Sequence, residues 1–174
     1  MWVGRWRPFI GLASQSVKAV PSALPLVCLL PYEVEVNSDL KVKWARTRSW
    51  CDLIVKGAEE SALDPLLVAA VIWQESGGDP LAYSSSGAVG LMQIMPKDGI
   101  AAEKICVNGP CFSDRPTTQE LQNPEFNIRY GCRMLADLIT RLGSKREALM
   151  AYGPENIGYE YANTVLGLYA ILSQ

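Results

Sequence analysis

The sequence contains no histidine. This absence excludes metal sites built on imidazole and the Ser–His or Cys–His pairs that many hydrolases use. Positive charge is also scarce, because 16 Lys and Arg residues stand against 18 Asp and Glu and give a pI near 5.2. With this balance we do not expect a nucleic-acid binder that works through a basic face. Any chemistry has to rely on carboxylates, hydroxyls, amides or thiols.

Long apolar runs are missing as well. The strongest stretch, residues 19–30, is interrupted by two prolines and is too short to cross a bilayer. It follows three basic residues and no acidic one, which is the charge order of a signal peptide, although no A-x-A cleavage site comes after it. Residues 1–39 therefore have three interpretations: a degenerate export signal, a membrane-proximal anchor, or an extension from a start codon placed too early. Membrane association through this tail stays open with them.

Cysteines are few, and none of the five falls in a C-x-x-C pair. We therefore expect no structural zinc site, and we predict neither a metal nor another cofactor. Cys106 and Cys111 flank Val-Asn-Gly-Pro, in which the Asn-Gly pair favours a tight turn. Two alternatives follow: a small loop disulfide in an exported protein, or two free thiols in a cytosolic loop.

The length of 174 residues fits one domain, and 49% hydrophobic with 20% charged residues is ordinary for a globular chain. From about residue 40, apolar residues recur at steps of three and four, which is the spacing of amphipathic helices, and no strand pattern stands out. We therefore predict an all-α domain over residues 40–174, preceded by the tail of residues 1–39. We expect this domain to work as a monomer.

Capping residues predict where the helices begin and end. A first helix is expected from about Leu40 to Ser61, and a second, apolar nearly all round, starts at Asp64-Pro65 and stops at Gly77-Gly78. The other predicted helices are a short piece at Leu91–Met95, a long helix between Asn123-Pro124 and Gly143, a helix opened by a capping box at Ser144–Glu147 and closed by Gly153-Pro154, and a last one from about Tyr159 to Leu172. Residues 97–120 are predicted to be irregular.

Glu75 stands out in the last turn of the second helix, which is otherwise mainly Leu, Val, Ala, Ile and Trp. Apolar neighbours and the negative end of the helix dipole both disfavour a charged carboxylate at this place. Both effects raise the pKa of the carboxyl toward the value that a general acid needs near neutral pH. On position alone, the alternative is a Glu that points into water at a frayed helix end.

The residues around Glu75 carry a longer pattern. Glu75-Ser76 is followed by Asp79-Pro80, by Ser84 and by the run Gly-Ala-Val-Gly-Leu-Met-Gln-Ile-Met-Pro at residues 87–96. This block resembles the signature of the soluble lytic transglycosylases, which are peptidoglycan-cleaving enzymes with a lysozyme-like fold. The resemblance extends over roughly residues 50–170 through Leu63–Leu67, Ala69–Ile72, Leu121–Leu135, Ala151-Tyr152 and Tyr161 with Val165-Leu166.

The resemblance implies a helical domain of the goose-type lysozyme and transglycosylase class. It implies cleavage of the β-1,4 bond between N-acetylmuramic acid and N-acetylglucosamine in peptidoglycan strands. Glu75 would act first as an acid on the glycosidic oxygen and then as a base, helping the sugar's own 6-hydroxyl to attack the anomeric carbon. The product is a 1,6-anhydromuramic end. One carboxyl then suffices, whereas ordinary glycosidases pair two.

Four further positions carry over from the family, each with a structural alternative. Ser84 is expected near the sugar's acetamido group, or else caps its own loop. Gln93 and Met95 are expected to line the sugar groove, against surface solvation for Gln93 and core packing for Met95. The hydroxyl of Tyr152 is expected to reach toward the catalytic carboxyl, against a buried aromatic. The Asn that the family has after this Tyr is absent, because a Gly-Pro pair follows directly.

Two alternative functions share the predicted fold. A hydrolysing lysozyme needs a second carboxylate to activate water, for which Asp79, Asp98 and Glu103 are candidates. An inactive peptidoglycan-binding protein would keep the fold without the chemistry, but the retention of Glu75 and Gln93 argues against it. The substrate implies action in the cell envelope or outside the cell, or delivery to the wall by a phage.

Overall fold

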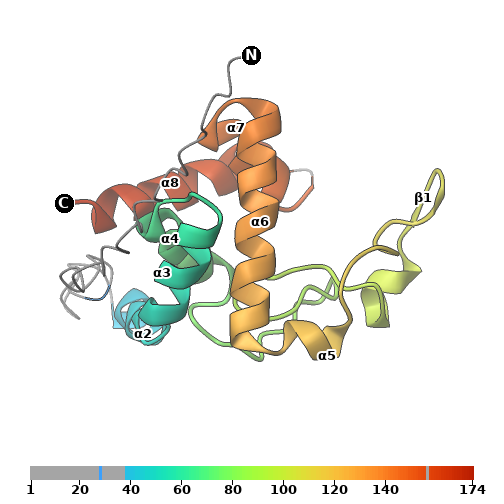
Figure 1. The fold of residues 1–174 in the computed structure, drawn as a ribbon, viewed down its shortest axis with the longest axis horizontal. Coiled ribbons are helices and arrows are strands. Elements are labelled where there is room, and N and C mark those ends of the chain that lie inside the picture. Colours follow the sequence, from blue (N-terminus) through green and yellow to red (C-terminus); the bar gives the residue numbers. More distant parts are fainter. Residues whose placement is uncertain (1–27, 29–37, 156) are drawn as a thin grey trace, which may run out of the picture.

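The structure, a computed structural model, describes residue 28 and residues 38–155 and 157–174, and these form mainly helices (Figure 1). In chain order the elements are α2 (Ser38–Arg48), α3 (Cys51–Glu60), α4 (Pro65–Glu75), the 3-10 helix η1 (Gly99–Glu103), β1 (Ile105–Cys106), β2 (Gly109–Pro110), α5 (Thr118–Leu121), α6 (Pro124–Leu142), α7 (Lys145–Tyr152) and α8 (Glu160–Leu172). The predicted all-α class is confirmed, since the two strands hold only two residues each. Among the helices described, none has the length and apolar character to span a membrane.

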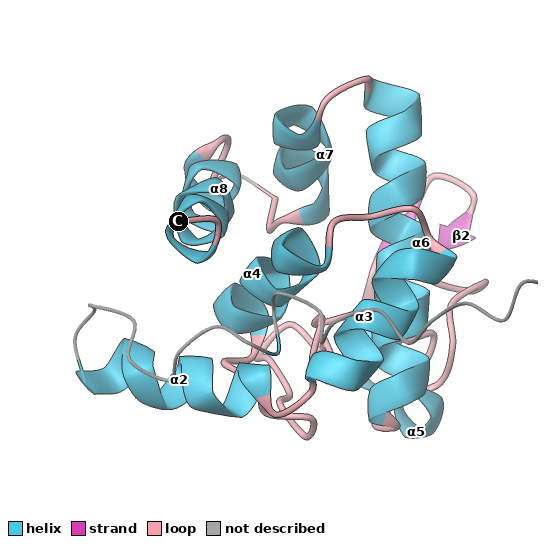
Figure 2. Cartoon of the chain, turned by 60° about the vertical axis from the view of Figure 1, so that its left-hand side comes forward, coloured by secondary structure: helices cyan, strands magenta, loops and turns pink. Residues whose placement is uncertain are grey.

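Helix α4 forms the centre of the hydrophobic core. It lies between α8 and α3 (Figure 2) and also packs against α2. Every residue from 66 to 73 is buried, because the sequence there is apolar on all sides. Asp64 caps the first turn by accepting the backbone N–H of Leu66 at 2.9 Å, and Pro65 takes the first helical position, as predicted. Close packing on every side of α4 and the cap at Asp64 hold its last residue in one place.

Helix α6 is the long helix that the sequence predicted, and it packs against α3, α5 and α7. The Asn123 side chain accepts the N–H of Phe126 at 3.0 Å, and Gly143 ends the helix in the left-handed region with φ +76°. Ser144 then caps α7 by accepting the N–H of Glu147. The Glu147 carboxylate accepts the hydroxyl of Tyr159 at 2.8 Å instead of completing the predicted capping box.

The single helix predicted from Leu40 to Ser61 is wrong, because the chain turns at Ser49-Trp50 and forms α2 and α3. The Trp50 N–H bonds the carbonyl of Thr47 at 3.1 Å, and its indole N–H donates to the carbonyl of Gly78 at 2.9 Å. That second bond joins positions 28 residues apart. Apolar spacing continues through the break on both sides, so periodicity alone could not locate it.

The helical piece predicted at Leu91–Met95 is also wrong. Residues 89–94 form a tight reversal in which Val89 and Ile94 exchange backbone hydrogen bonds of 2.9 and 3.1 Å. Gly90 and Gln93 both have positive φ, of +78° and +47°, which a right-handed helix does not permit. A side chain at residue 90 would collide with Asn127, so only glycine fits there.

The region predicted to be irregular, residues 97–120, contains the short hairpin β1–β2, which projects from the helical body (Figure 1). Cys106 and Cys111 are joined by a disulfide across its turn, with Cα atoms 5.0 Å apart. Of the two alternatives left open for these cysteines, the structure has the loop disulfide. The N–H of Cys111 bonds the carbonyl of Lys104 at 2.9 Å and extends the pairing toward the rest of the chain.

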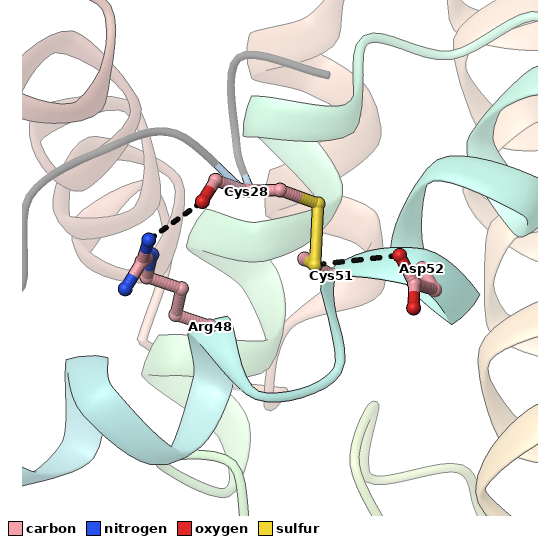
Figure 3. Close-up of a disulfide and its surroundings, with 4 residues drawn as sticks. All are labelled: Cys28, Arg48, Cys51 and Asp52. Atoms are coloured by element: carbon pink, nitrogen blue, oxygen red, sulfur yellow. Dashed lines mark hydrogen bonds between the residues drawn. A yellow bond between two sulfur atoms is a disulfide. The ribbon is translucent and has the colours of Figure 1, made fainter. Parts of the chain in front are cut away.

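A second disulfide, between Cys28 and Cys51, was not predicted (Figure 3). It ties the N-terminal part of the chain to the start of α3, and the guanidinium of Arg48 donates to the carbonyl of Cys28 at 2.6 Å. Helix α2 begins at Ser38, close to the predicted domain boundary at residue 40. The three interpretations of the tail fall on residues 1–39, of which all but Cys28, Ser38 and Asp39 lie outside the described residues.

Candidate active site

Glu75 is the last residue of α4 and lines an open cleft of about 820 Å³. The next residue, Ser76, caps the helix and donates its hydroxyl to the carbonyl of Leu91 at 2.9 Å, which fixes the helix end against the reversal at residues 89–94. Burial raises the pKa of Glu75 to about 7, against the lowering effect of a hydrogen bond from Tyr161. The carboxyl is therefore half protonated near neutral pH, which suits a group that first donates and then accepts a proton.

The partner of Glu75 is Tyr161 of α8, whose hydroxyl donates to the carboxylate Oε1 at 2.5 Å. The sequence analysis gave this contact to Tyr152, and that assignment is wrong. The Tyr152 hydroxyl donates to the carbonyl of Met92 at 2.8 Å, while its ring stacks on that of Tyr161 with centroids 6.4 Å apart. The two rings lie side by side, so a sequence comparison could not tell which hydroxyl meets the carboxylate.

One glycine leaves room for the ring of Tyr161. A Cβ atom at Gly153 would lie 2.5 Å from the ring of Tyr161, so the loop after α7 can pack against this ring only without a side chain. Burial and the charge of Glu75 raise the pKa of Tyr161 well above its usual value, so its hydroxyl keeps its proton and remains a donor. A buried tyrosine needs a hydrogen-bond partner, and this rule together with its place on the apolar face of α8 could have pointed to Tyr161.

Removing this hydroxyl should change the pH dependence of any reaction that needs Glu75 protonated. In Tyr161→Phe the carboxylate loses a hydrogen bond that favours its charged form, so its pKa rises. We expect the basic limb of the kcat/KM profile, near pH 7 in the wild type, to move to higher pH. Rates measured from pH 4 to 9 test this. Tyr159→Phe is the control, since that exposed hydroxyl bonds only Glu147 among the described residues; an unchanged limb in Tyr161→Phe contradicts the assignment.

The other predicted site residues lie around the same cleft. Ser84, Gln93, Met95 and Tyr152 line it together with Glu75, although they come from different parts of the chain. The Ser84 hydroxyl accepts the N–H of Ala88 at 2.9 Å, so it caps its loop as well as facing the cleft. The side-chain amide of Gln93 donates to the carbonyls of Ala82 and Gly90 at 3.1 and 3.0 Å. Their contacts with a sugar stay predictions.

Asn127 of α6 supports this wall of the cleft and was given no role from the sequence. It is fully buried, and its Oδ1 accepts the N–H of Met92 at 2.8 Å. Its amide donates to the carbonyls of Val89 and Leu121, both at 2.9 Å. One side chain thus joins the reversal at residues 89–94 to α5 and α6. The sequence could have indicated this role, because Asn127 is a polar residue next to Ile128 on the face predicted to be buried, and a buried amide needs hydrogen-bond partners.

None of the carboxylates proposed as a lysozyme's second group lines the cleft. Asp79, Asp98 and Glu103 are outside its lining residues, and Asp98 accepts both the N–H and the hydroxyl of Thr118, which lower its pKa. Apart from Glu75, the acidic residues that line the cleft are Asp137 and Glu155. In the described part of the chain, the group with metal-ligand spacing is Cys28, Cys51 and Asp52, and its two sulfurs are bonded to each other (Figure 3).

Comparison with known protein families identifies the fold. The model of the Transglycosylase SLT domain matches residues 52–164, which is most of the helical part of the chain. The chain belongs to this family. The match begins in α3 and ends in α8, so it includes Glu75, the cleft-lining loops and Tyr161.

Individual relatives agree with the family assignment. The endo-type membrane-bound lytic murein transglycosylase A of Citrobacter koseri is 37% identical over 102 residues, covering 59% of this chain and 48% of the relative. The membrane-bound lytic murein transglycosylase E of Buchnera aphidicola is 36% identical over 106 residues, covering 60% of this chain and 47% of the relative. The SLT-family chain thus spans about half the length of the curated relatives it matches.

A solved structure shows the same fold. The lytic transglycosylase Slt of Pseudomonas aeruginosa, solved as an inactive Glu-to-Gln mutant, superposes with a TM-score of 0.54 and 24% identity, over 71% of this chain and 24% of that one. The helical domain therefore has the lysozyme-like transglycosylase fold that the sequence predicted.

Proposed function

We propose that this SLT-family protein is a lytic transglycosylase that cleaves the β-1,4 bond between N-acetylmuramic acid and N-acetylglucosamine in peptidoglycan. The observation that carries the proposal is Glu75, a carboxyl with a pKa raised to about 7 on the wall of an open cleft. The curated relatives are named as murein transglycosylases, and residues 52–164 match their family. Glu75 lies inside the matched range.

The proposed reaction needs one carboxyl used twice. Protonated Glu75 gives its proton to the glycosidic oxygen as the bond from that oxygen to the anomeric carbon of muramic acid breaks. The resulting carboxylate then takes the proton of the 6-hydroxyl on the same sugar, and the oxygen of that hydroxyl forms a bond to the anomeric carbon. Glu75 ends protonated, no water is consumed, and the strand carries a 1,6-anhydromuramic end. Tyr161 stabilises the carboxylate form between the two steps through its 2.5 Å hydrogen bond.

The mass of the products tests this proposal. The full chain is incubated with purified peptidoglycan, and the soluble fragments are analysed by mass spectrometry. We expect fragments one water lighter than muropeptides with reducing ends. Reducing ends of ordinary mass would contradict the proposal and support a hydrolysing lysozyme, with Asp137 and Glu155 as the first candidates for its second carboxylate. Absence of any release from folded protein would support a peptidoglycan-binding role.

The same proposal places the protein in the cell envelope, where peptidoglycan lies outside the cytoplasmic membrane. Two disulfides, Cys28–Cys51 and Cys106–Cys111, support an oxidising compartment, because such bonds are rare in reducing cytosol. Export by the cell and delivery by a phage particle would both bring the enzyme to this substrate. Glycan strands are the proposed partner.

A further inference from the structure

The cleft contains a positively charged side chain that the proposed reaction does not use. Arg115 is half-buried in the segment between the hairpin and α5, and it lines the cleft together with Glu75. Among the described residues, the ion pairs are Lys43–Asp39, Lys56–Glu125 and Arg129–Glu60, and none of them includes Arg115. A cation without an acidic partner in a substrate cleft is a candidate for binding an anion of the substrate.

Neighbouring rings hold this guanidinium in place. It lies 6.0 Å from the ring centroid of Phe112 and 5.9 Å from that of Tyr130, and it also contacts the sulfur of Met134. The backbone N–H of Arg115 bonds the carbonyl of Phe112 at 3.0 Å and fixes the turn that carries the side chain. Because the side chain is already ordered, a ligand that binds it loses less conformational freedom than one that binds a mobile arginine.

The charges around Arg115 favour an anionic ligand. Lys104 and Arg141 line the same cleft, while its acidic lining residues are Glu75, Asp137 and Glu155. Burial raises the pKa of Glu75 and so reduces its negative charge. The other two lining carboxylates are exposed, and they stand against three cations. Burial raises the pKa of Tyr152, another lining residue, and the positive charge of Arg115 acts in the opposite direction.

We propose that Arg115 binds a carboxylate of the stem peptide attached to muramic acid, and that it gives the protein a preference for strands that carry these peptides. This inference rests on the proposed function. In a strand that carries peptides, the lactyl carboxyl of muramic acid is consumed in the amide bond to the stem peptide. The free carboxylates then lie on the peptide alone, so a guanidinium in this cleft distinguishes the peptide from the sugar. A planar guanidinium offers two parallel N–H donors to a carboxylate, which a lysine does not.

Binding to matched ligands tests the proposal without turnover. All chains carry Glu75→Gln. The ligands are one peptidoglycan tetrasaccharide with its tetrapeptides and the same tetrasaccharide without them, whose lactyl carboxyls are capped as amides so that it carries no carboxylate. Adding Arg115→Gln is expected to raise Kd for the peptide-bearing ligand about tenfold and to leave Kd for the bare sugar within about twofold. Arg133→Gln is the control, since Arg133 is an exposed cation of α6 outside the cleft lining. Calorimetry measures each Kd.

A third ligand keeps the test valid even if Arg115→Gln fails to fold. Amidation of the peptide carboxylates should raise Kd about tenfold for the Glu75→Gln chain, which keeps Arg115. It should not change Kd for the chain that also carries Arg115→Gln. Equal losses on both tetrasaccharides, or no loss on either, would overturn the proposal. The product digest of the wild type tests the transglycosylase activity separately. If the protein discriminates between the ligands but cleaves no peptidoglycan, the carboxylate subsite is supported and the proposed function is contradicted.

Discussion

Glu75→Gln is expected to lower the rate of anhydromuropeptide release by about 10²- to 10⁴-fold, the usual contribution of a general acid and base. Glutamine keeps the size of the side chain and can still accept the hydroxyl of Tyr161, but it can neither donate a proton to the glycosidic oxygen nor take one from the 6-hydroxyl. Initial rates on purified peptidoglycan, with products counted by mass spectrometry, measure the loss.

The same substitution is expected to increase the stability of the fold at pH 8. The folded pKa of about 7 lies above the ordinary 4.5, so the unfolded chain releases the proton first as pH rises. Above pH 7 the folded protein holds an unfavourable buried charge that glutamine lacks. The gain should vanish below about pH 4.5, where both states keep the proton. Urea unfolding of both proteins at pH 8 and pH 4 measures it.

Opposite effects on rate and stability distinguish chemistry from unfolding. Glu103→Gln is the matched control, because Glu103 is an exposed carboxylate of η1 outside the cleft lining. We expect it to change neither the rate nor the stability of the fold. A Glu75→Gln protein that keeps most of the wild-type rate would remove Glu75 from the mechanism.

Asn127→Ala is expected to destabilise the fold by about 3–5 kcal/mol, since two buried backbone groups that lose their only side-chain partner each cost about 1–3 kcal/mol. The N–H of Met92 and the carbonyl of Leu121 lose their bonds to Asn127, while the carbonyl of Val89 keeps the N–H of Ile94 at 3.1 Å. A cavity beside Gly90 adds to the cost. Urea unfolding measures the change in free energy.

Because the side chain of Asn127 holds the reversal at residues 89–94, activity should fall together with stability, even under conditions where the variant is folded. Asn163→Ala is the control, since Asn163 is exposed and makes one 3.4 Å bond with Arg146; we expect it to cost less than about 0.5 kcal/mol. A loss of similar size in both variants would contradict the role given to Asn127.

Helix ends and the position of Glu75 could be predicted from the sequence because they depend on neighbouring residues. Asp64-Pro65 starts α4, Asn123 and Gly143 bound α6, and Glu75 ends an apolar helix. Each signal acts over a few residues: a side chain that satisfies a free N–H, a proline that fits only the first turn, or a glycine in the left-handed region. The cleft-lining residues could also be predicted, because the family motif is recognised from the order of its residues along the chain.

Contacts between distant residues were decided by the tertiary structure. The break at Ser49-Trp50 depends on an indole bond to Gly78, and the reversal at residues 89–94 depends on Asn127. In both places the spacing of apolar residues predicted a helix, and the structure has none. The Cys28–Cys51 disulfide similarly joins positions that no turn signal brings together.

The sequence by itself determined a helical domain with Glu75 at the end of a buried helix and a set of residues that face one cleft. Only the tertiary structure decided that Tyr161, rather than Tyr152, bonds this carboxyl. It also decided that Arg115 lines the cleft near the rings of Phe112 and Tyr130, without an acidic partner among the described residues. The physical reason is distance along the chain. Capping and periodicity act within one or two turns, whereas a hydrogen bond between residues 86 positions apart exists only after α4 and α8 have packed.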